Sequence, residues 1–151
     1  MSSFSDTNVD PYFCSAPEER NEIVNGFWLS SLPKEIPYNV KYVISMIGQQ
    51  NYKYHPHQKI ITTFFEDADI LPPPAYLHGL ADLVNTCRKD GVTLIHCLAG
   101  LNRSALIAGL ALVKSGMEAQ IAVDNMRRIR GQDVLHNKVF LDWLLKQNLH
   151  K

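Results

Sequence analysis

The segment 92–104 holds the residues whose types and spacing could do chemistry: Cys97, then Arg103 six positions later, then Ser104. Residues 92–96 have the apolar character of a strand, and the residues after Ser104 are apolar nearly all round, as in a central buried helix. A loop between a strand and a helix aims several backbone N–H groups into one space, where they favour an anion. We therefore expect Cys97 to be a thiolate nucleophile at neutral pH.

The neighbours of Cys97 predict a site for a phosphorus oxyanion. The planar guanidinium of Arg103 can hold two oxygens of a tetrahedral anion, which a lysine cannot do in the same way. Gly100 lets the turn tighten, and the hydroxyl of Ser104 can hydrogen-bond the sulfur. These parts predict in-line attack of sulfur on phosphorus and a phosphocysteine intermediate. The alternative is that Cys97 is only a small buried residue near the end of a strand.

His96, Cys97, Arg103 and Ser104 form the pattern His-Cys-x5-Arg-Ser, which resembles the signature of the cysteine-based protein tyrosine phosphatase superfamily. The ending Gly-Leu-Asn-Arg-Ser is most similar to the small, atypical dual-specificity branch, and the likeness extends from about residue 21 to residue 149. The resemblance implies that Cys97, Arg103, Asp67 and Ser104 are catalytic and that His96 orients the loop. The substrate-binding residues that it implies are Leu98, Ala99, Gly100, Leu101, Asn102 and Arg103.

The resemblance also implies a general acid on a loop roughly thirty residues before the cysteine. Asp67 lies 30 positions before Cys97 and Asp69 lies 28, both between an expected strand and a helix start marked by prolines. We favour Asp67, because Phe-Phe-Glu-Asp followed shortly by prolines is similar to the acid loop of several family members. Asp69 is the second candidate and Glu66 the third. The alternative for all three is a solvated cluster of carboxylates at a turn or helix start.

The elements that must position these residues occur in the order of an α/β domain. Runs rich in β-branched and aromatic residues predict strands at 23–32, which Asn25 and Gly26 divide as a hairpin, and at 40–47, 59–65 and 92–96. Helical spacing of apolar residues predicts a helix that starts at the prolines 72–74 and is stopped by Gly91, and further helices at 104–114, 118–130 and 137–149. We expect a three-layer α/β fold, with a central, mostly parallel twisted sheet flanked by helices and a phosphate-binding loop between strand and helix.

The three cysteines exclude a disulfide framework as the main source of stability and favour a reducing compartment. Cys87 falls on the expected apolar face of its helix, which favours core packing; that face consists of Tyr76, Leu80, Leu83, Val84 and Cys87. The alternative is a resolving cysteine that forms a disulfide with oxidised Cys97. Cys14 lies in the polar N-terminal tail. The three arginines 127, 128 and 130 complement the C-terminal dipole of a helix, and we expect no catalytic role for them.

Length and charge bound the class of protein. The 151 residues predict a tail at 1–20 and one catalytic domain over 21–151. Fifteen basic and fifteen acidic residues give a net charge of zero, which disfavours nucleic-acid and membrane partners. The sequence has no signal-peptide pattern and no long apolar run, so we expect a cytoplasmic protein, with nuclear access left open. We expect neither a metal nor a cofactor, and the sequence does not indicate an oligomeric state.

These inferences predict a phosphoprotein phosphatase that acts on phosphotyrosine, together with phosphoserine and phosphothreonine. Leu98, Ala99, Leu101 and Asn102 are uncharged, whereas the similar enzymes that hydrolyse inositol lipids carry lysines there. The apolar rim suits an aryl ring, and the expected partner is a phosphorylated protein. The alternatives are a pseudophosphatase that binds phosphoproteins without turnover, an RNA 5′-triphosphatase or other non-protein phosphatase of the superfamily, and a sulfur-transfer or arsenate-reducing protein.

Overall fold

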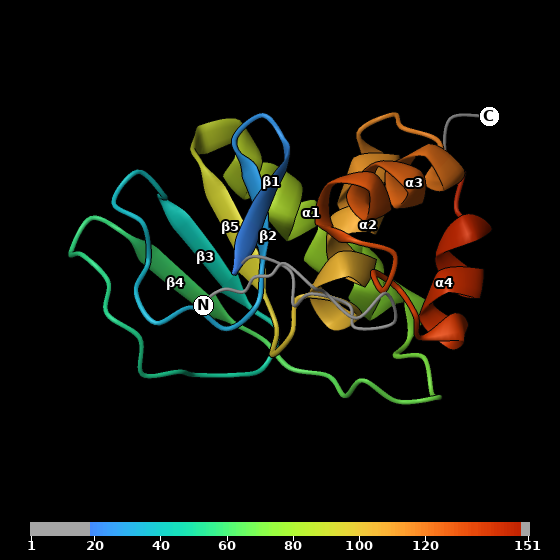
Figure 1. The fold of residues 1–151 in the computed structure, drawn as a ribbon, viewed down its shortest axis with the longest axis horizontal. Helices are drawn as coiled ribbons and strands as arrows, with labels where there is room; N and C mark the ends of the chain where they lie inside the picture. The colour runs from blue at the N-terminus through green and yellow to red at the C-terminus, as the bar shows by residue number, and fades with distance from the viewer. Residues whose placement is uncertain (1–18, 149–151) are drawn as a thin grey trace, which may run out of the picture.

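The computed structural model describes residues 19–148, which are built around a five-stranded sheet in the order β1-β2-β5-β3-β4 (Figure 1). β1 (Arg20–Val24) and β2 (Phe27–Ser30) form an antiparallel hairpin, whose turn contains Gly26 with a φ of 76°. β3 (Tyr42–Ser45), β4 (Lys59–Thr62) and β5 (Thr93–His96) continue the sheet with parallel pairing. The predicted hairpin and the mostly parallel sheet are confirmed.

Four helices lie on one side of this sheet (Figure 1): α1 (Pro74–Asp90), α2 (Arg103–Lys114), α3 (Ala119–Arg130) and α4 (Lys138–Leu145), the last of which packs on α2 and α3. α2 lies among the others and is buried from Ser104 through Val113, as its uniformly apolar sequence predicts. The main core joins the helices to the inward side chains of Phe27, Leu29 and Ile95. This core fixes the start of α2 against the end of β5.

The opposite face of the sheet is covered by the segments 31–41 and 46–58. Ile36, Val40 and Tyr52 from these segments pack with Val43 and Leu94 of the sheet in a second, smaller apolar cluster. Within the described residues these two segments contain no helix. The α/β class with a sheet flanked by helices is confirmed, and the layer over this second face consists of loops.

The buried face of α1 differs from the predicted one. Its buried residues are Leu77, Leu80, Ala81, Val84 and Cys87. Tyr76, which we expected on this face, is 40% exposed. Its hydroxyl lies 2.5 Å from the Thr63 hydroxyl oxygen and donates to the Phe64 carbonyl at 3.2 Å, which ties the start of α1 to the segment after β4.

Three further expectations concern the ends of the chain and its elements. α4 ends at Leu145 instead of continuing to residue 149, because Lys146 and Gln147 close the helix with short-range backbone hydrogen bonds. Cys14 and almost all of the expected tail lie outside the described residues. None of the helices in residues 19–148 combines the length and the hydropathy that crossing a bilayer requires.

Candidate active site

The segment 97–102, referred to below as the phosphate loop, connects the end of β5 to the start of α2. Cys97 is 3% exposed, and its Sγ accepts the backbone N–H of Gly100 at 3.2 Å. The Ser104 hydroxyl oxygen lies 3.1 Å from the same sulfur. Both contacts can donate to a thiolate, so three residues predicted from the sequence meet at one atom.

Gly100 occupies a position that only glycine fits. Its φ is 71°, and a Cβ there would lie 2.5 Å from the carbonyl oxygen of Ser30 and 2.6 Å from Nη2 of Arg130. Both the backbone conformation and the close approach of β2 therefore require glycine. The tight turn that results brings the Gly100 N–H to the sulfur.

Arg103 begins α2 and carries a donor that has no acceptor in the described part of the chain. Its Nη1 lies 3.5 Å from the Phe65 carbonyl oxygen. Its Nε is buried and has no hydrogen-bond partner among the described residues. A buried N–H that is left unpaired is costly, and an oxygen of a bound oxyanion would satisfy it. The guanidinium is therefore suited to bind an anion beside Cys97.

Arg130, at the end of α3, supports the phosphate loop and was missed from the sequence. Its side chain is buried, and it donates through Nε to the Gly100 carbonyl at 2.9 Å and through Nη2 to the Ala99 carbonyl at 3.1 Å. Burial lowers the pKa of Arg130, and the nearby Cys97 opposes that shift. Arg130 thus binds the carbonyl oxygens of the turn, while the N–H group of Gly100 faces the sulfur of Cys97. A cation at a helix end is a common pattern, so the sequence held no signal for this contact.

His96 is fixed by two hydrogen bonds on the loop-covered face of the sheet. Its Nδ1 lies 3.2 Å from the Cys97 carbonyl oxygen, and its Nε2 lies 3.0 Å from the Tyr52 hydroxyl. A carbonyl can only accept, so Nδ1 carries the proton and Nε2 accepts from Tyr52. Burial lowers the pKa of His96 to about 4 and raises the pKa of Tyr52 to about 12. The neutral imidazole is suited to orienting the loop.

This burial predicts that acid destabilises the protein through His96. The imidazole takes up a proton near pH 6.5 in the unfolded chain and near pH 4 in the folded one, so the unfolded state binds more protons between these values. The free energy of unfolding should fall by about 2 kcal/mol from this group between pH 7 and pH 5. Urea unfolding at pH 7 and at pH 5 measures this fall in the free energy of unfolding. His96→Asn, which has no imidazole to protonate, is the comparison. Equal losses in wild type and variant would contradict the assignment.

Asp67 is the candidate acid that the structure brings to the phosphate loop. Its carboxylate accepts from the side-chain amides of Asn102 at 2.9 Å and Asn137 at 2.8 Å. The side chains of Asp69 and Glu66 make no hydrogen bond or ion pair within residues 19–148. Asn102, expected to bind substrate, thus directs its side chain to the acid loop.

The remaining loop residues form the rim. Leu98 is 61% exposed, Ala99 is also exposed, and Leu101 is half-buried. Cys87 lies in the core near the end of α1, where burial raises the pKa of its thiol. That end of α1 leads into the start of β5, whereas Cys97 follows the other end of the strand. This placement favours the core role for Cys87, and its disulfide with Cys97 stays a prediction.

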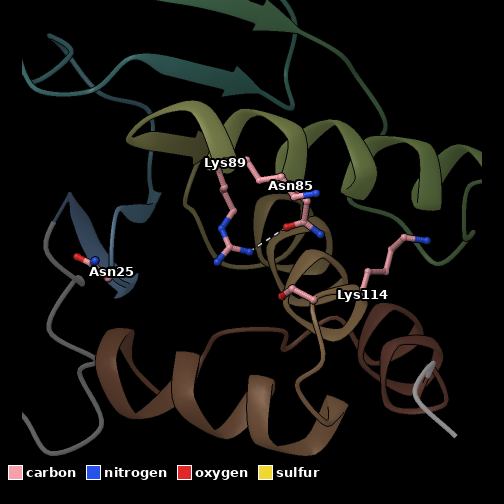
Figure 2. A pocket seen from close by; sticks show the side chains of 6 residues that line it. Asn25, Asn85, Lys89 and Lys114 are labelled. Carbon is pink, nitrogen blue, oxygen red and sulfur yellow. Dashed lines mark hydrogen bonds between the residues drawn. The ribbon is translucent and has the colours of Figure 1, made fainter.

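A cationic pocket lies at the far end of α2 (Figure 2). It is lined by Asn25, Asn85, Arg88, Lys89, Lys114 and Ser115. Arg88 lies 4.7 Å from the Phe27 ring centroid and donates to Asn85 at 2.9 Å, and Lys114 lies 3.3 Å from an Asp82 oxygen. Cations in the last turns of α1 and α2 also complement the helix dipoles. These contacts explain the cations structurally, and α2 separates them from the phosphate loop by about 18 Å.

Comparison with known proteins places this chain in a family. The family model for "Dual specificity phosphatase, catalytic domain" matches residues 28–149. A probable dual specificity protein phosphatase from Dictyostelium discoideum is 28% identical over an alignment of 92 residues that covers 58% of this chain and 23% of that protein. The chain therefore spans less than a quarter of the length of this curated relative.

Solved structures share the fold. OH1 from the Orf virus, described as a tyrosine phosphatase with triple substrate specificity, superposes with a TM-score of 0.73 at 18% identity over 91% of both chains. Human DUSP28 superposes with a TM-score of 0.71 at 18% identity, covering 83% of this chain and 93% of that one. Because the family model spans most of the sequence, from β2 to beyond α4, the chain belongs to the dual specificity phosphatase catalytic-domain family.

Proposed function

We propose that this protein is a phosphoprotein phosphatase that hydrolyses phosphotyrosine, and also phosphoserine and phosphothreonine, through a phosphocysteine intermediate. One observation carries the proposal. The sulfur of Cys97 lies within hydrogen-bond distance of the Gly100 N–H and the Ser104 hydroxyl, and Arg103, where the same loop enters α2, carries a buried N–H that has no partner among the described residues. A nucleophile and an unsatisfied cationic donor on one short loop suit attack on a phosphate better than a structural role.

In the first step, Sγ of Cys97 attacks phosphorus. The sulfur–phosphorus bond forms, and the bond from phosphorus to the ester oxygen breaks, with its electron pair going to that oxygen. Arg103 and the N–H groups of the phosphate loop bind the other phosphoryl oxygens, where negative charge is concentrated. Asp67 gives its proton to the leaving oxygen, so the alcohol or phenol departs neutral.

In the second step, water attacks the phosphocysteine. An oxygen–phosphorus bond forms, the sulfur–phosphorus bond breaks, and the water proton passes to the carboxylate of Asp67. Cys97 leaves as a thiolate, which the Ser104 hydroxyl and the Gly100 N–H can stabilise by hydrogen bonds. Inorganic phosphate is the second product, and the site returns to its starting protonation.

The rim of the phosphate loop supports aryl phosphates as substrates. Leu98 projects from it and Leu101 is half-buried, so an aromatic ring would meet apolar surface. The loop holds no lysine that would meet additional phosphates, which supports phosphoproteins over inositol lipids. We propose the cytoplasm as the compartment, because phosphoproteins occur there and cysteines stay reduced.

The test of this function is phosphate release by the full chain. It should hydrolyse 4-nitrophenyl phosphate in the presence of a metal chelator, and vanadate should inhibit, because it mimics five-coordinate phosphorus. A phosphotyrosine peptide should be hydrolysed at least as fast as the same peptide with phosphothreonine. Binding of the peptide without phosphate release would indicate a pseudophosphatase. Faster release from 5′-triphosphorylated RNA would indicate the non-protein alternative.

A further inference from the structure

The carboxylate of Asp67 is held by two asparagine amides from distant parts of the chain. Nδ2 of Asn102, on the phosphate loop, donates to one oxygen at 2.9 Å. Nδ2 of Asn137, the residue that precedes α4, donates to the other at 2.8 Å. A carboxylate has about four acceptor sites, so further sites remain for a proton. Asp67 is thus oriented through both oxygens and can still transfer a proton.

The amide of Asn102 can point in only one direction. Its Oδ1 accepts the backbone N–H of Asn137 at 2.9 Å, and its Nδ2 also lies 3.2 Å from Nε2 of His136. The residue is 4% exposed. Turning the amide over would set its oxygen against the Asp67 carboxylate and its NH₂ group against an N–H, and both contacts are repulsive. The donor to Asp67 is therefore fixed by its surroundings.

The amide of Asn137 is fixed by its role as the N-cap of α4. Its Oδ1 accepts the backbone N–H of Phe140 at 3.2 Å. This bond leaves Nδ2 for the loop that carries the acid, where it donates to the Ala68 carbonyl at 3.0 Å as well as to Asp67. The helix cap and the hold on the acid therefore use opposite ends of the same side chain.

The segment before α4 is itself docked on the phosphate loop. The backbone N–H of Leu135 donates to the Leu101 carbonyl at 2.7 Å. Leu135 adopts a φ of 58°, a left-handed conformation that a leucine disfavours, so its surroundings must enforce it. On the other side, Arg103 reaches the Phe65 carbonyl at 3.5 Å. The acid loop, the phosphate loop and the start of α4 are connected as one unit.

We propose that Asn102 and Asn137, together referred to as the amide clasp, are positioning residues that hold Asp67 where it can protonate the leaving oxygen. This proposal rests on the proposed function and makes the clasp a determinant of substrate range. A strongly basic leaving group must receive a proton as its bond to phosphorus breaks, whereas 4-nitrophenolate leaves as a stable anion. The clasp therefore matters most for the esters found in phosphoproteins and least for nitrophenyl phosphate.

The test compares kcat on phenyl phosphate and on 4-nitrophenyl phosphate. For Asn102→Ala we expect kcat to fall about tenfold or more on phenyl phosphate and less than about threefold on 4-nitrophenyl phosphate, with little change in KM. Adding Asn102→Ala to Asp67→Ala should slow phenyl phosphate hydrolysis no further, because residues that act through one group are not additive. Equal losses on both substrates, or a further loss in the double variant, would overturn the proposal.

A second variant distinguishes the loss of a hydrogen bond to Asp67 from a loss of folding. Asn137→Ser keeps an oxygen that can cap Phe140, but it lacks the amide that donates to Asp67. It should show the same selective loss, and it decides the question if Asn102→Ala does not fold. Asn85→Ala is the matched control: this amide is also bonded at both ends, but it lies on α1 beside the pocket in Figure 2. It should leave the ratio of the two rates unchanged.

Two failures remain distinguishable. If Asp67→Ala hydrolyses phenyl phosphate as fast as wild type, the acid assigned in the proposed function is wrong. If Asp67→Ala is slow on phenyl phosphate while Asn102→Ala and Asn137→Ser keep the wild-type ratio, the acid assignment stands and the clasp is refuted.

Discussion

Replacing Cys97 by serine is expected to abolish phosphate release while preserving phosphopeptide binding. A serine hydroxyl is a far weaker nucleophile than a thiolate, and the hydrogen bonds of the Ser104 hydroxyl and the Gly100 N–H to the sulfur suit a thiolate nucleophile. We expect kcat to fall by about 10⁴-fold or more. Arg103 and the backbone N–H groups stay in place, so calorimetry should show that the variant still binds a phosphotyrosine peptide.

Cys87→Ser is the matched control for that experiment. It makes the same change in a cysteine that is 4% exposed in the core, far along α1 from the phosphate loop. It should lower the free energy of unfolding, because a buried hydroxyl replaces an apolar contact, and it should leave kcat unchanged. Wild-type enzyme that is quenched with acid during turnover should carry phosphate on the Cys97 peptide. Phosphate release by Cys97→Ser at the wild-type rate would refute the mechanism.

The phosphate loop could be predicted because its information is local. Cys97, Gly100, Arg103 and Ser104 lie within eight consecutive positions, and the strand before them and the helix after them have distinct apolar patterns. The hairpin at Gly26 follows for the same reason, since its turn needs a residue that tolerates a positive φ. Contacts between residues that are close in the sequence can therefore be predicted from one sequence alone.

The contacts that support the loop could not be predicted, because they join distant segments. Arg130 reaches Gly100 across 30 positions, Tyr52 reaches His96 across 44, and Asn137 reaches Asp67 across 70. Each of these side chains also has an ordinary local explanation, such as a helix-end cation, a loop tyrosine or a helix N-cap. Only the packing of the sheet and helices shows that they act on one site.

The misplaced face of α1 has a similar origin. Tyr76 has helical spacing with Leu80 and Leu83, so the pattern alone includes it in the apolar stripe. In the fold, the stripe starts at Leu77, and the Tyr76 hydroxyl bonds to the segment that follows β4. A tyrosine satisfies a helical pattern whether its ring packs inward or its hydroxyl finds a partner at the edge.

Removing the carboxyl of Asp67 is expected to produce the second large effect. Asp67→Ala should lower kcat on a phosphotyrosine peptide by about 10²- to 10⁴-fold, because the leaving phenolate would depart without a proton. Stopped assays of phosphate release from the phosphotyrosine peptide measure this loss.

Asp69→Ala is the control that decides between the two neighbouring carboxylates. Asp69 is exposed and its side chain makes no hydrogen bond or ion pair within the described residues, whereas Asp67 is bonded to Asn102 of the phosphate loop. Its removal should therefore change kcat by less than about threefold. If Asp69→Ala shows the large loss and Asp67→Ala the small one, the general acid is Asp69. The amide contacts of Asp67 would then serve only to anchor the loop that carries both residues.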